Sequence, residues 1–192
     1  MRTTLALAAS LAAAVFASAS QAETANYTLD PTHTFVMYEV QHFGTSTNRG
    51  RFQAKQGSVQ LDKARKTGKV EVAFDITSVN TGVPALDKHL QNKDFFDAEE
   101  YPDGKFVADK FTFNGDKVAE VSGQLTLRGK TNPVTLKAAN FNCYNNPMFK
   151  KEVCGGDFET TIRRSQWGVD WGLNYGFPDA IRLVVQVEGI RQ

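Results

Sequence analysis

Most of the chain alternates between apolar and polar side chains, which is the pattern of β-strands that bury one face. The clearest run has apolar side chains at every second position from Val70 to Ile76, and residues 120–128 and 181–188 repeat the pattern. Weaker runs cover residues 35–43, 52–61, 106–113, 134–138 and 158–162. The pattern therefore predicts eight strands.

Breaks in this rhythm predict where strands bend and where other structure lies. Gly57 and the pair Asp109–Lys110 interrupt the alternation, which indicates β-bulges or bends. Pro133 is expected to start its strand. Residues 84–92 predict a short helix, because proline is near its start and two leucines recur four residues apart. A second irregular stretch, residues 167–178, is rich in glycine and aromatic side chains.

Consecutive strands joined by short turns favour an antiparallel up-and-down arrangement. Closing such a sheet into a barrel removes its exposed edges, and the fold class is therefore expected to be all-β, an eight-stranded antiparallel barrel with a short covering helix. A flattened sandwich is the competing architecture. Eight strands enclose an interior that side chains can fill or that can hold one small ligand.

The first residues have the character of a cleavable export signal. Arg2 precedes an apolar run from Leu5 to Ala19, and Ser20-Gln21-Ala22 is a small-x-small cleavage pattern. The run is too short to span a bilayer comfortably, which takes about 20 residues. We therefore expect a signal peptide at 1–22 and a mature, exported single domain at 23–192.

The two cysteines, Cys143 and Cys154, both lie in the part expected to be exported, where thiols usually pair. The turn signal Asn145-Asn146-Pro147 lies between them, so a disulfide would close a local hairpin. Their spacing is not the Cys-x-x-Cys of redox catalysis. The sequence predicts a structural disulfide.

The charge is balanced, with a formal net charge of +1 for the whole chain, and this argues against a nucleic-acid partner. Short basic clusters are interpreted as solvated turns and strand faces: Lys63/Arg65/Lys66/Lys69, Lys150/Lys151 and Arg163/Arg164. The alternative is contact with an anionic headgroup or a membrane surface. The acidic residues near the predicted helix are likewise interpreted as its solvated face: Asp87, Asp94, Asp97, Glu99 and Glu100.

Candidate chemistry is sparse. No Gly-x-Ser-x-Gly motif is present, no catalytic residues are assigned, and the protein is not expected to be an enzyme. His33, His42 and His89 lack the spacing of a zinc site, so no metal is expected. His42 has inward parity and is either a satisfied core residue or a donor to a ligand. His89 is expected to be exposed and His33 to lie near a turn.

The inward positions are strongly apolar and aromatic, which fits a packed core or the wall of a ligand cavity. A helix carrying Leu86 and Leu90, followed by Phe95-Phe96, is placed like an apolar lid and favours the cavity. The candidate ligand-binding residues are Tyr38, Val40, His42, Phe52, Phe74, Leu86, Leu90, Phe96, Phe106, Leu125 and Leu183.

Several motifs, taken in order, resemble the YceI-like polyisoprenoid-binding proteins. They are Tyr27-Thr-Leu-Asp-Pro-Thr-His33-Thr-Phe-Val, Val40-Gln-His42-Phe-Gly44, Gly50-Arg-Phe52, Asp87-Lys-His89-Leu90, Asp94-Phe-Phe96-Asp97, Tyr101-Pro102, Gly123-Gln-Leu-Thr-Leu-Arg-Gly129, Pro133-Val-Thr-Leu136 and Val187-Glu188-Gly189. The segments 143–154 and 165–177 depart from simpler members, and both are expected near a barrel mouth, where a headgroup would lie.

The resemblance implies a lipocalin-like barrel in the periplasm that encloses an isoprenoid lipid, such as a quinone or a polyprenyl lipid. The expected function is therefore that of a binding and carrier protein, with no cofactor apart from the bound lipid. An enzyme that acts on a lipid-like substrate, or a stress-protective protein with a filled core, is the alternative. No stable membrane insertion is expected, and transient membrane contact and a homodimer stay open.

Overall fold

The computed structural model describes residues 24–192, so the expected signal peptide at 1–22 lies outside the described residues. Among the described residues, no helix is long and apolar enough to cross a bilayer. The strands are β1 (Ala25–Leu29), β2 (Phe35–His42), β3 (Ser46–Asp62), β4 (Thr67–Asn80), β5 (Asp103–Asn114), β6 (Lys117–Leu127), β7 (Lys130–Asn146), β8 (Lys151–Arg163) and β9 (Ala180–Arg191). The helices are α1 (Pro84–Gln91) and two 3₁₀ turns, η1 (Arg164–Trp167) and η2 (Leu173–Tyr175).

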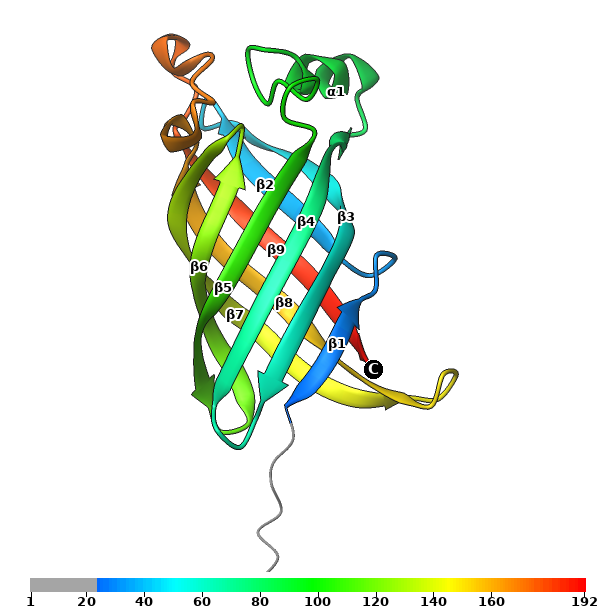
Figure 1. Ribbon diagram of the computed structural model, residues 1–192. Helices are drawn as coiled ribbons and strands as arrows, with labels where there is room; N and C mark the ends of the chain where they lie inside the picture. The colour runs from blue at the N-terminus through cyan, green and yellow to red at the C-terminus, as the bar shows by residue number, and fades with distance from the viewer. Residues whose placement is uncertain (1–23) are drawn as a thin grey trace, which may run out of the picture.

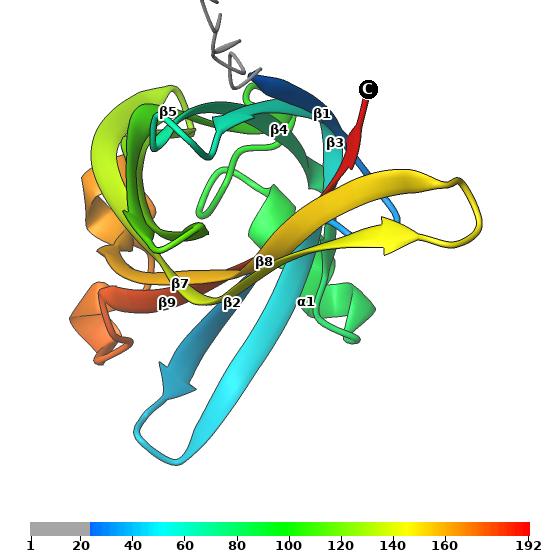
Figure 2. The same cartoon turned by 90° about the horizontal axis from the view of Figure 1, so that it is seen from below.

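All strand pairs are antiparallel, and together they close an up-and-down barrel (Figures 1 and 2). The sequence pattern missed β1, yet the expected eight-position barrel is confirmed. Strands β1 and β2 lie end to end in one position, because both pair with β3 on one side and with β9 on the other. In the break between them, the buried Thr34 hydroxyl bonds the backbone of Glu188 in β9.

Bulges occur close to the predicted breaks in the alternation. The β5–β6 register shifts between Ala108 and Lys110, and the β3–β4 register shifts between Ala54 and Gln56, just before Gly57. The expectation that Pro133 starts a strand was wrong, because β7 begins at Lys130. Proline is tolerated there because β7 pairs only with β6 at this point; its pairing with β8 begins at Lys137.

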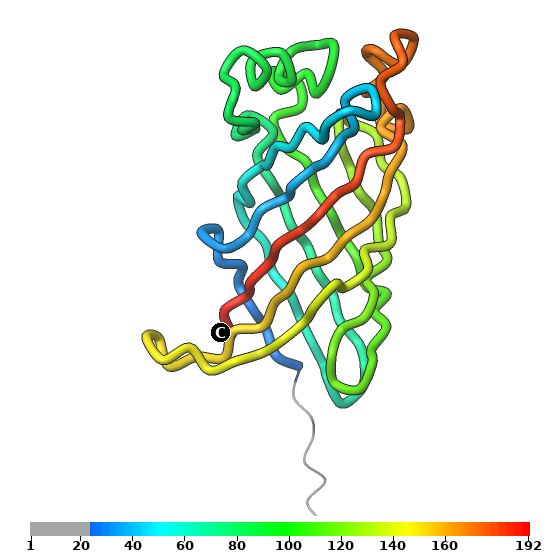
Figure 3. The backbone as a smooth tube through the Cα atoms, turned by 180° about the vertical axis from the view of Figure 1, so that it is seen from behind, coloured from blue at the N-terminus to red at the C-terminus, as the bar shows by residue number. Residues whose placement is uncertain are grey.

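Because neighbouring strands run in opposite directions, successive connections lie alternately at the two ends of the barrel (Figures 1 and 3). The helix end carries the β2–β3 turn, α1, and the η1–η2 connection. The hairpin end carries the β3–β4 and β5–β6 turns and the β7–β8 hairpin with its disulfide. The expectation that residues 143–154 lie near a mouth where a headgroup would bind was therefore wrong, because they form the packed end of the barrel, one full strand (β8) away from residues 165–177.

Side chains fill the interior at the hairpin end. Its buried residues include Tyr27, Leu61, Val118, Val121, Phe141 and Cys154. The predicted disulfide is present, with Cys143 and Cys154 directly opposite each other in the β7–β8 ladder. These contacts make the hairpin end a packed core in which the first and last strands meet.

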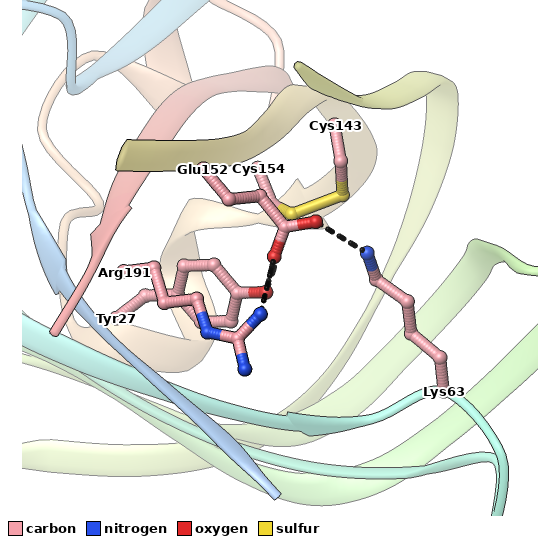
Figure 4. The surroundings of a disulfide bond; sticks show 6 residues. All are labelled: Tyr27, Lys63, Cys143, Glu152, Cys154 and Arg191. Carbon is pink, nitrogen blue, oxygen red and sulfur yellow. Dashed lines mark hydrogen bonds and ion pairs between the residues drawn. A yellow bond between two sulfur atoms is a disulfide. The ribbon is translucent and has the colours of Figure 1, made fainter. Parts of the chain in front are cut away.

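A polar cluster lies beside the disulfide (Figure 4). The Tyr27 hydroxyl donates to Glu152 Oε1 at 2.6 Å, and Lys63 Nζ lies 3.2 Å from Glu152 Oε2. Burial raises the pKa of Tyr27, and its hydrogen bond to Glu152 raises it further. Burial alone would raise the pKa of Glu152, but hydrogen bonds from Tyr27 and Lys63 bring it below its ordinary value. The cluster ties β8 to β1 and to the β3–β4 turn.

Removing the disulfide is expected to destabilise the protein by about 3 kcal/mol, because the bridge closes a short loop and restricts the unfolded chain. Urea unfolding of the Cys143→Ala/Cys154→Ala variant measures this difference. An unchanged free energy of unfolding would contradict the structural role of the bridge.

The Glu152 cluster also predicts an acid-sensitive part of the stability. Because the folded state lowers the pKa of Glu152, its contribution is complete above the ordinary value of 4.5 and is lost as the pH falls through the folded pKa. The Glu152→Gln variant keeps an acceptor for Tyr27 but lacks this titration. Unfolding measured between about pH 6 and 3 should show a smaller loss of stability in the variant than in wild type; parallel curves would refute the assignment.

Candidate functional site

The half of the barrel nearest α1 is hollow. A cavity of about 450 Å³ lies among the inward side chains of β2–β9, within the range of small-molecule sites. The interior is thus neither wholly filled nor wholly empty: packed side chains form its floor and α1 with residues 95–96 lies over its mouth (Figure 1).

All eleven predicted ligand-binding residues line this cavity, and it brings them together from six strands, α1 and the loop after α1. They are Tyr38, Val40, His42, Phe52, Phe74, Leu86, Leu90, Phe96, Phe106, Leu125 and Leu183. Parity identified the strand positions among them because inward residues of an antiparallel barrel recur at every second place. Their contact with a ligand stays a prediction.

Aromatic rings form the inner part of the cavity wall. Phe52 lies at the centre of this group, with its ring centroid 5.9 Å from that of Phe74, 5.3 Å from that of Phe96 and 6.0 Å from that of Tyr38. Glycines opposite two of these rings make room for them. A Cβ on Gly50 would lie 2.5 Å from the Tyr38 ring, and one on Gly104 would lie 2.2 Å from the Phe74 ring.

A second aromatic group lies at the mouth, where α1 meets the η1–η2 connection. The Trp171 ring centroid lies 5.0 Å from His89, 5.2 Å from Phe95 and 5.9 Å from Phe177. His89 is therefore half-buried in the cavity wall, and the expectation that it is exposed was wrong. Its edge-to-face ring partners are Phe95, just after the helix, and Trp171 from a loop distant in sequence, and helix periodicity does not indicate the second contact.

His42 lies at the edge of the mouth and is exposed, so the interpretation as a satisfied core histidine was wrong. Its ring packs against Phe43 at 5.0 Å and Phe177 at 5.6 Å between centroids. Within residues 24–192 no carboxylate hydrogen-bonds to His42, which leaves it without the partner that usually orients a catalytic base. His33 is near a turn as expected and bonds to Asp30 at 2.8 Å, away from the cavity.

Polar groups in the cavity wall are few, and apart from Tyr38 in the inner aromatic group they lie toward the mouth. They are Tyr38, Gln41, His42, Asn48, His89 and Arg164. No described residue hydrogen-bonds to the Tyr38 hydroxyl, and its pKa is raised, first by burial and then by the nearby Asp87 carboxylate. Tyr38 therefore stays neutral and can donate a hydrogen bond inside an otherwise apolar space.

Arg164 holds the mouth loop in shape, and its interpretation as a solvated basic residue was wrong. It is 8% exposed and donates to the backbone carbonyls of Pro178, Val169 and Trp171 at 3.0, 2.9 and 2.8 Å. Burial lowers its guanidinium pKa. One sequence feature could have predicted this role of Arg164. The irregular, glycine-rich stretch that follows it has carbonyls without strand partners, and these carbonyls need a donor.

The acidic residues near α1 are only partly a solvated face. The Asp87 carboxylate accepts hydrogen bonds from the Thr81 amide and hydroxyl at 2.7 and 2.6 Å, and so fixes the start of the helix. Asp97 is 8% exposed, which contradicts the interpretation as a solvated residue. Asp94, Glu99 and Glu100 are exposed as expected.

Among the described residues, none of the three histidines belongs to a group of three metal-ligand side chains. In the described part of the chain, one group of three side chains has its possible ligand atoms within 4.8 Å of one another: Cys143, Glu152 and Cys154. Both sulfurs of this group are already joined in the disulfide. The arrangement offers an apolar chamber with a few hydrogen-bonding groups in its wall.

Replacing Arg164 should disturb the mouth more than the rest of the barrel. Arg164→Met keeps an unbranched, flexible side chain but leaves three carbonyls unpaired, at an expected cost of at least about 2 kcal/mol. Both tryptophans, Trp167 and Trp171, lie in this loop, so intrinsic fluorescence reports its order directly. The exposed neighbour gives a matched control, Arg163→Met. Equal effects of the two substitutions would contradict the assigned role.

Comparison with known proteins assigns the fold to a family. A family model described as a YceI-like domain matches residues 27–189. A UPF0312 protein of Pseudomonas putida is 34% identical over 179 residues, which cover 91% of each chain. The crystal structure of a Campylobacter jejuni YCEI protein superposes with a TM-score of 0.68 at 28% identity, over 80% of this chain and 90% of that one.

A third relative shares the fold at lower identity. It is a domain from Saccharophagus degradans described as polyisoprenoid-binding, with a TM-score of 0.62 and 15% identity over 86% of this chain and 98% of that one. Together, the domain match across nearly all described strands and the barrel geometry show that the chain belongs to the YceI-like family.

Proposed function

We propose that the protein is a binding and carrier protein that holds a long isoprenoid lipid, of the quinone or polyprenyl type, in the cavity at the helix end. The observation that carries the proposal is an almost wholly apolar chamber of about 450 Å³ inside a stable, closed wall. The description of the Saccharophagus degradans domain as polyisoprenoid-binding, in a barrel of the same fold, supports this choice of ligand.

The apolar wall supplies the binding free energy. Each CH₂ group that leaves water for an apolar site contributes roughly 0.8 kcal/mol, so a tail of several isoprene units needs no specific polar contact. The rings of Phe52, Phe74 and Phe106 would contact the tail, and the packed hairpin end would limit how deep it reaches.

The polar groups at the mouth would orient the lipid. Asn48 lies opposite Val40 in the β2–β3 ladder, and His42 lies two residues further along β2, nearer the rim. These side chains can hydrogen-bond a quinone carbonyl or a phosphate-bearing headgroup while the tail lies inward. A carrier role, rather than catalysis, follows from a site that offers orientation and burial but no nucleophile paired with a base.

The periplasm is the proposed location. The export signal expected at 1–22 and the disulfide between Cys143 and Cys154 both suit an oxidising compartment outside the cytosol. A barrel that shields an insoluble tail from water would be useful there, because lipids must cross an aqueous space between membranes.

Filling the cavity should abolish lipid loading without unfolding the barrel. Val40 is half-buried and lines the cavity, so Val40→Trp adds bulk in the chamber itself. Val107 is exposed on the outer face of β5, and Val107→Trp adds the same bulk outside. Delipidated proteins are incubated with a long-tailed quinone and, separately, a polyprenyl phosphate, and the bound lipid per chain is counted by native mass spectrometry.

The expected result is about one lipid per chain for wild type and Val107→Trp, and at least roughly tenfold lower occupancy for Val40→Trp, because the new ring replaces the apolar volume that the tail would occupy. Full loading of folded Val40→Trp would place the lipid elsewhere. Failure of wild type to take up either lipid would overturn the proposed function itself.

A further inference from the structure

The tip of the β7–β8 hairpin projects from the barrel without a neighbouring strand. Pairing between β8 and β9 ends at Val153 opposite Ile190, whereas β7 and β8 stay paired as far as Asn146 and Lys151. The yellow hairpin therefore extends beyond the barrel wall at the end remote from α1 (Figures 1 and 2). The cavity wall includes none of its residues, so the proposed lipid site does not explain it.

This tip is held in one shape. The Asn146 side-chain oxygen accepts the Met148 amide at 2.8 Å, and the Asn146 carbonyl accepts the Lys150 amide at 2.8 Å. The disulfide bridges the two strands at the base of the tip. Glu152 connects the tip to the body of the barrel through Tyr27 and Lys63 (Figure 4). A surface loop ordered in this way presents its side chains at little entropic cost.

The ordered tip presents apolar side chains to water. Met148 is 81% exposed and Phe149 is 43% exposed, and Tyr144 on the same hairpin is also 43% exposed. Single exposed apolar residues are ordinary, but neighbouring ones on a projecting, braced turn favour an interaction site. The shape is convex, which suits insertion into a soft surface better than the enclosure of a small ligand.

The charged residues of the tip indicate which kind of surface it would bind. Lys150 and Lys151 follow the apolar pair directly, are exposed, and form no ion pair with any residue among 24–192. The acidic residue that follows, Glu152, is already paired with Lys63 at 3.2 Å and with Arg191 at 3.5 Å. The tip thus combines apolar side chains with two unneutralised positive charges, which is the combination that binds anionic lipid surfaces.

We propose that the hairpin tip, Met148–Lys151, docks the protein on an anionic membrane surface. Met148 and Phe149 enter the boundary between headgroups and acyl chains, while Lys150 and Lys151 contact lipid phosphates. The tip lies at the end of the barrel remote from α1 and projects to the side of the barrel (Figure 3), and none of its residues lines the cavity. The inference therefore does not depend on which lipid the cavity holds.

The test is co-sedimentation of the mature protein with vesicles of phosphatidylethanolamine and phosphatidylglycerol, compared with vesicles of phosphatidylcholine alone. One variant removes the apolar side chains, Met148→Ser/Phe149→Ser. A second removes the charges, Lys150→Asn/Lys151→Gln, with asparagine at the first position because Lys150 has a positive φ of 52°. The control is Tyr175→Ser, which removes a 66% exposed aromatic ring at the other end of the barrel.

Wild type and Tyr175→Ser should bind anionic vesicles, and binding should weaken as salt is added because the lysine contacts are screened. The charge variant should bind at least roughly tenfold more weakly, since each lysine near an anionic surface contributes about a factor of five. The apolar variant should lose binding to a similar degree, because it buries less apolar area at the headgroup boundary. Circular dichroism of all variants confirms the fold. Loss of the disulfide under reducing conditions should weaken binding in the same direction.

Four results would overturn the proposal. The first is no binding of wild type to anionic vesicles at low salt, and the second is unchanged binding of both hairpin variants. The third is a loss in Tyr175→Ser equal to that in the hairpin variants, which would make the mouth the docking end. Concentration-dependent dimerisation abolished by Met148→Ser/Phe149→Ser would assign the tip to a second copy of the chain instead. Lipid loading of the cavity is measured separately, so its failure is distinguishable from each of these.

Discussion

Closure of the barrel is the constraint on which the rest of the structure depends. Strands β1 and β2 share one position between β3 and β9, so every strand has two neighbours and each inward position faces a common interior. An eight-position barrel is just wide enough that side-chain size decides whether the interior is filled. Tyr27, Leu61 and Phe141 fill it at the hairpin end, while the aromatic rings at the helix end line a chamber instead.

The alternation of the sequence predicted the inward positions well, because parity along a strand is a local property. It could not predict whether opposing inward residues meet, since the gap between Phe74 and Leu183 depends on the circumference of the whole barrel. The position of the disulfide hairpin could have been predicted: β7–β8 and β8–β9 connections must lie at opposite ends of an up-and-down barrel. Strand β1 was missed because it is only five residues long and breaks before β2.

Two irregular segments have separate structural roles at the two ends of the barrel. The loop after β8 depends on Arg164, whose buried charge replaces the backbone partners that a regular strand would provide. Sequence pattern alone treats such an arginine as a surface residue, because its partners are carbonyls brought close only by folding. The β7–β8 hairpin instead depends on a covalent bridge and on Glu152, and it gives the protein a rigid cationic projection far from the cavity mouth.

The most direct test of a lipid-carrying cavity is to identify what the protein contains when it is purified from its native host. Native mass spectrometry of the wild-type protein, followed by organic extraction and lipid identification, measures both stoichiometry and chemistry. The account predicts one isoprenoid lipid per chain, released on denaturation. A uniformly empty protein, or one that carries only short lipids without an isoprenoid tail, would contradict it.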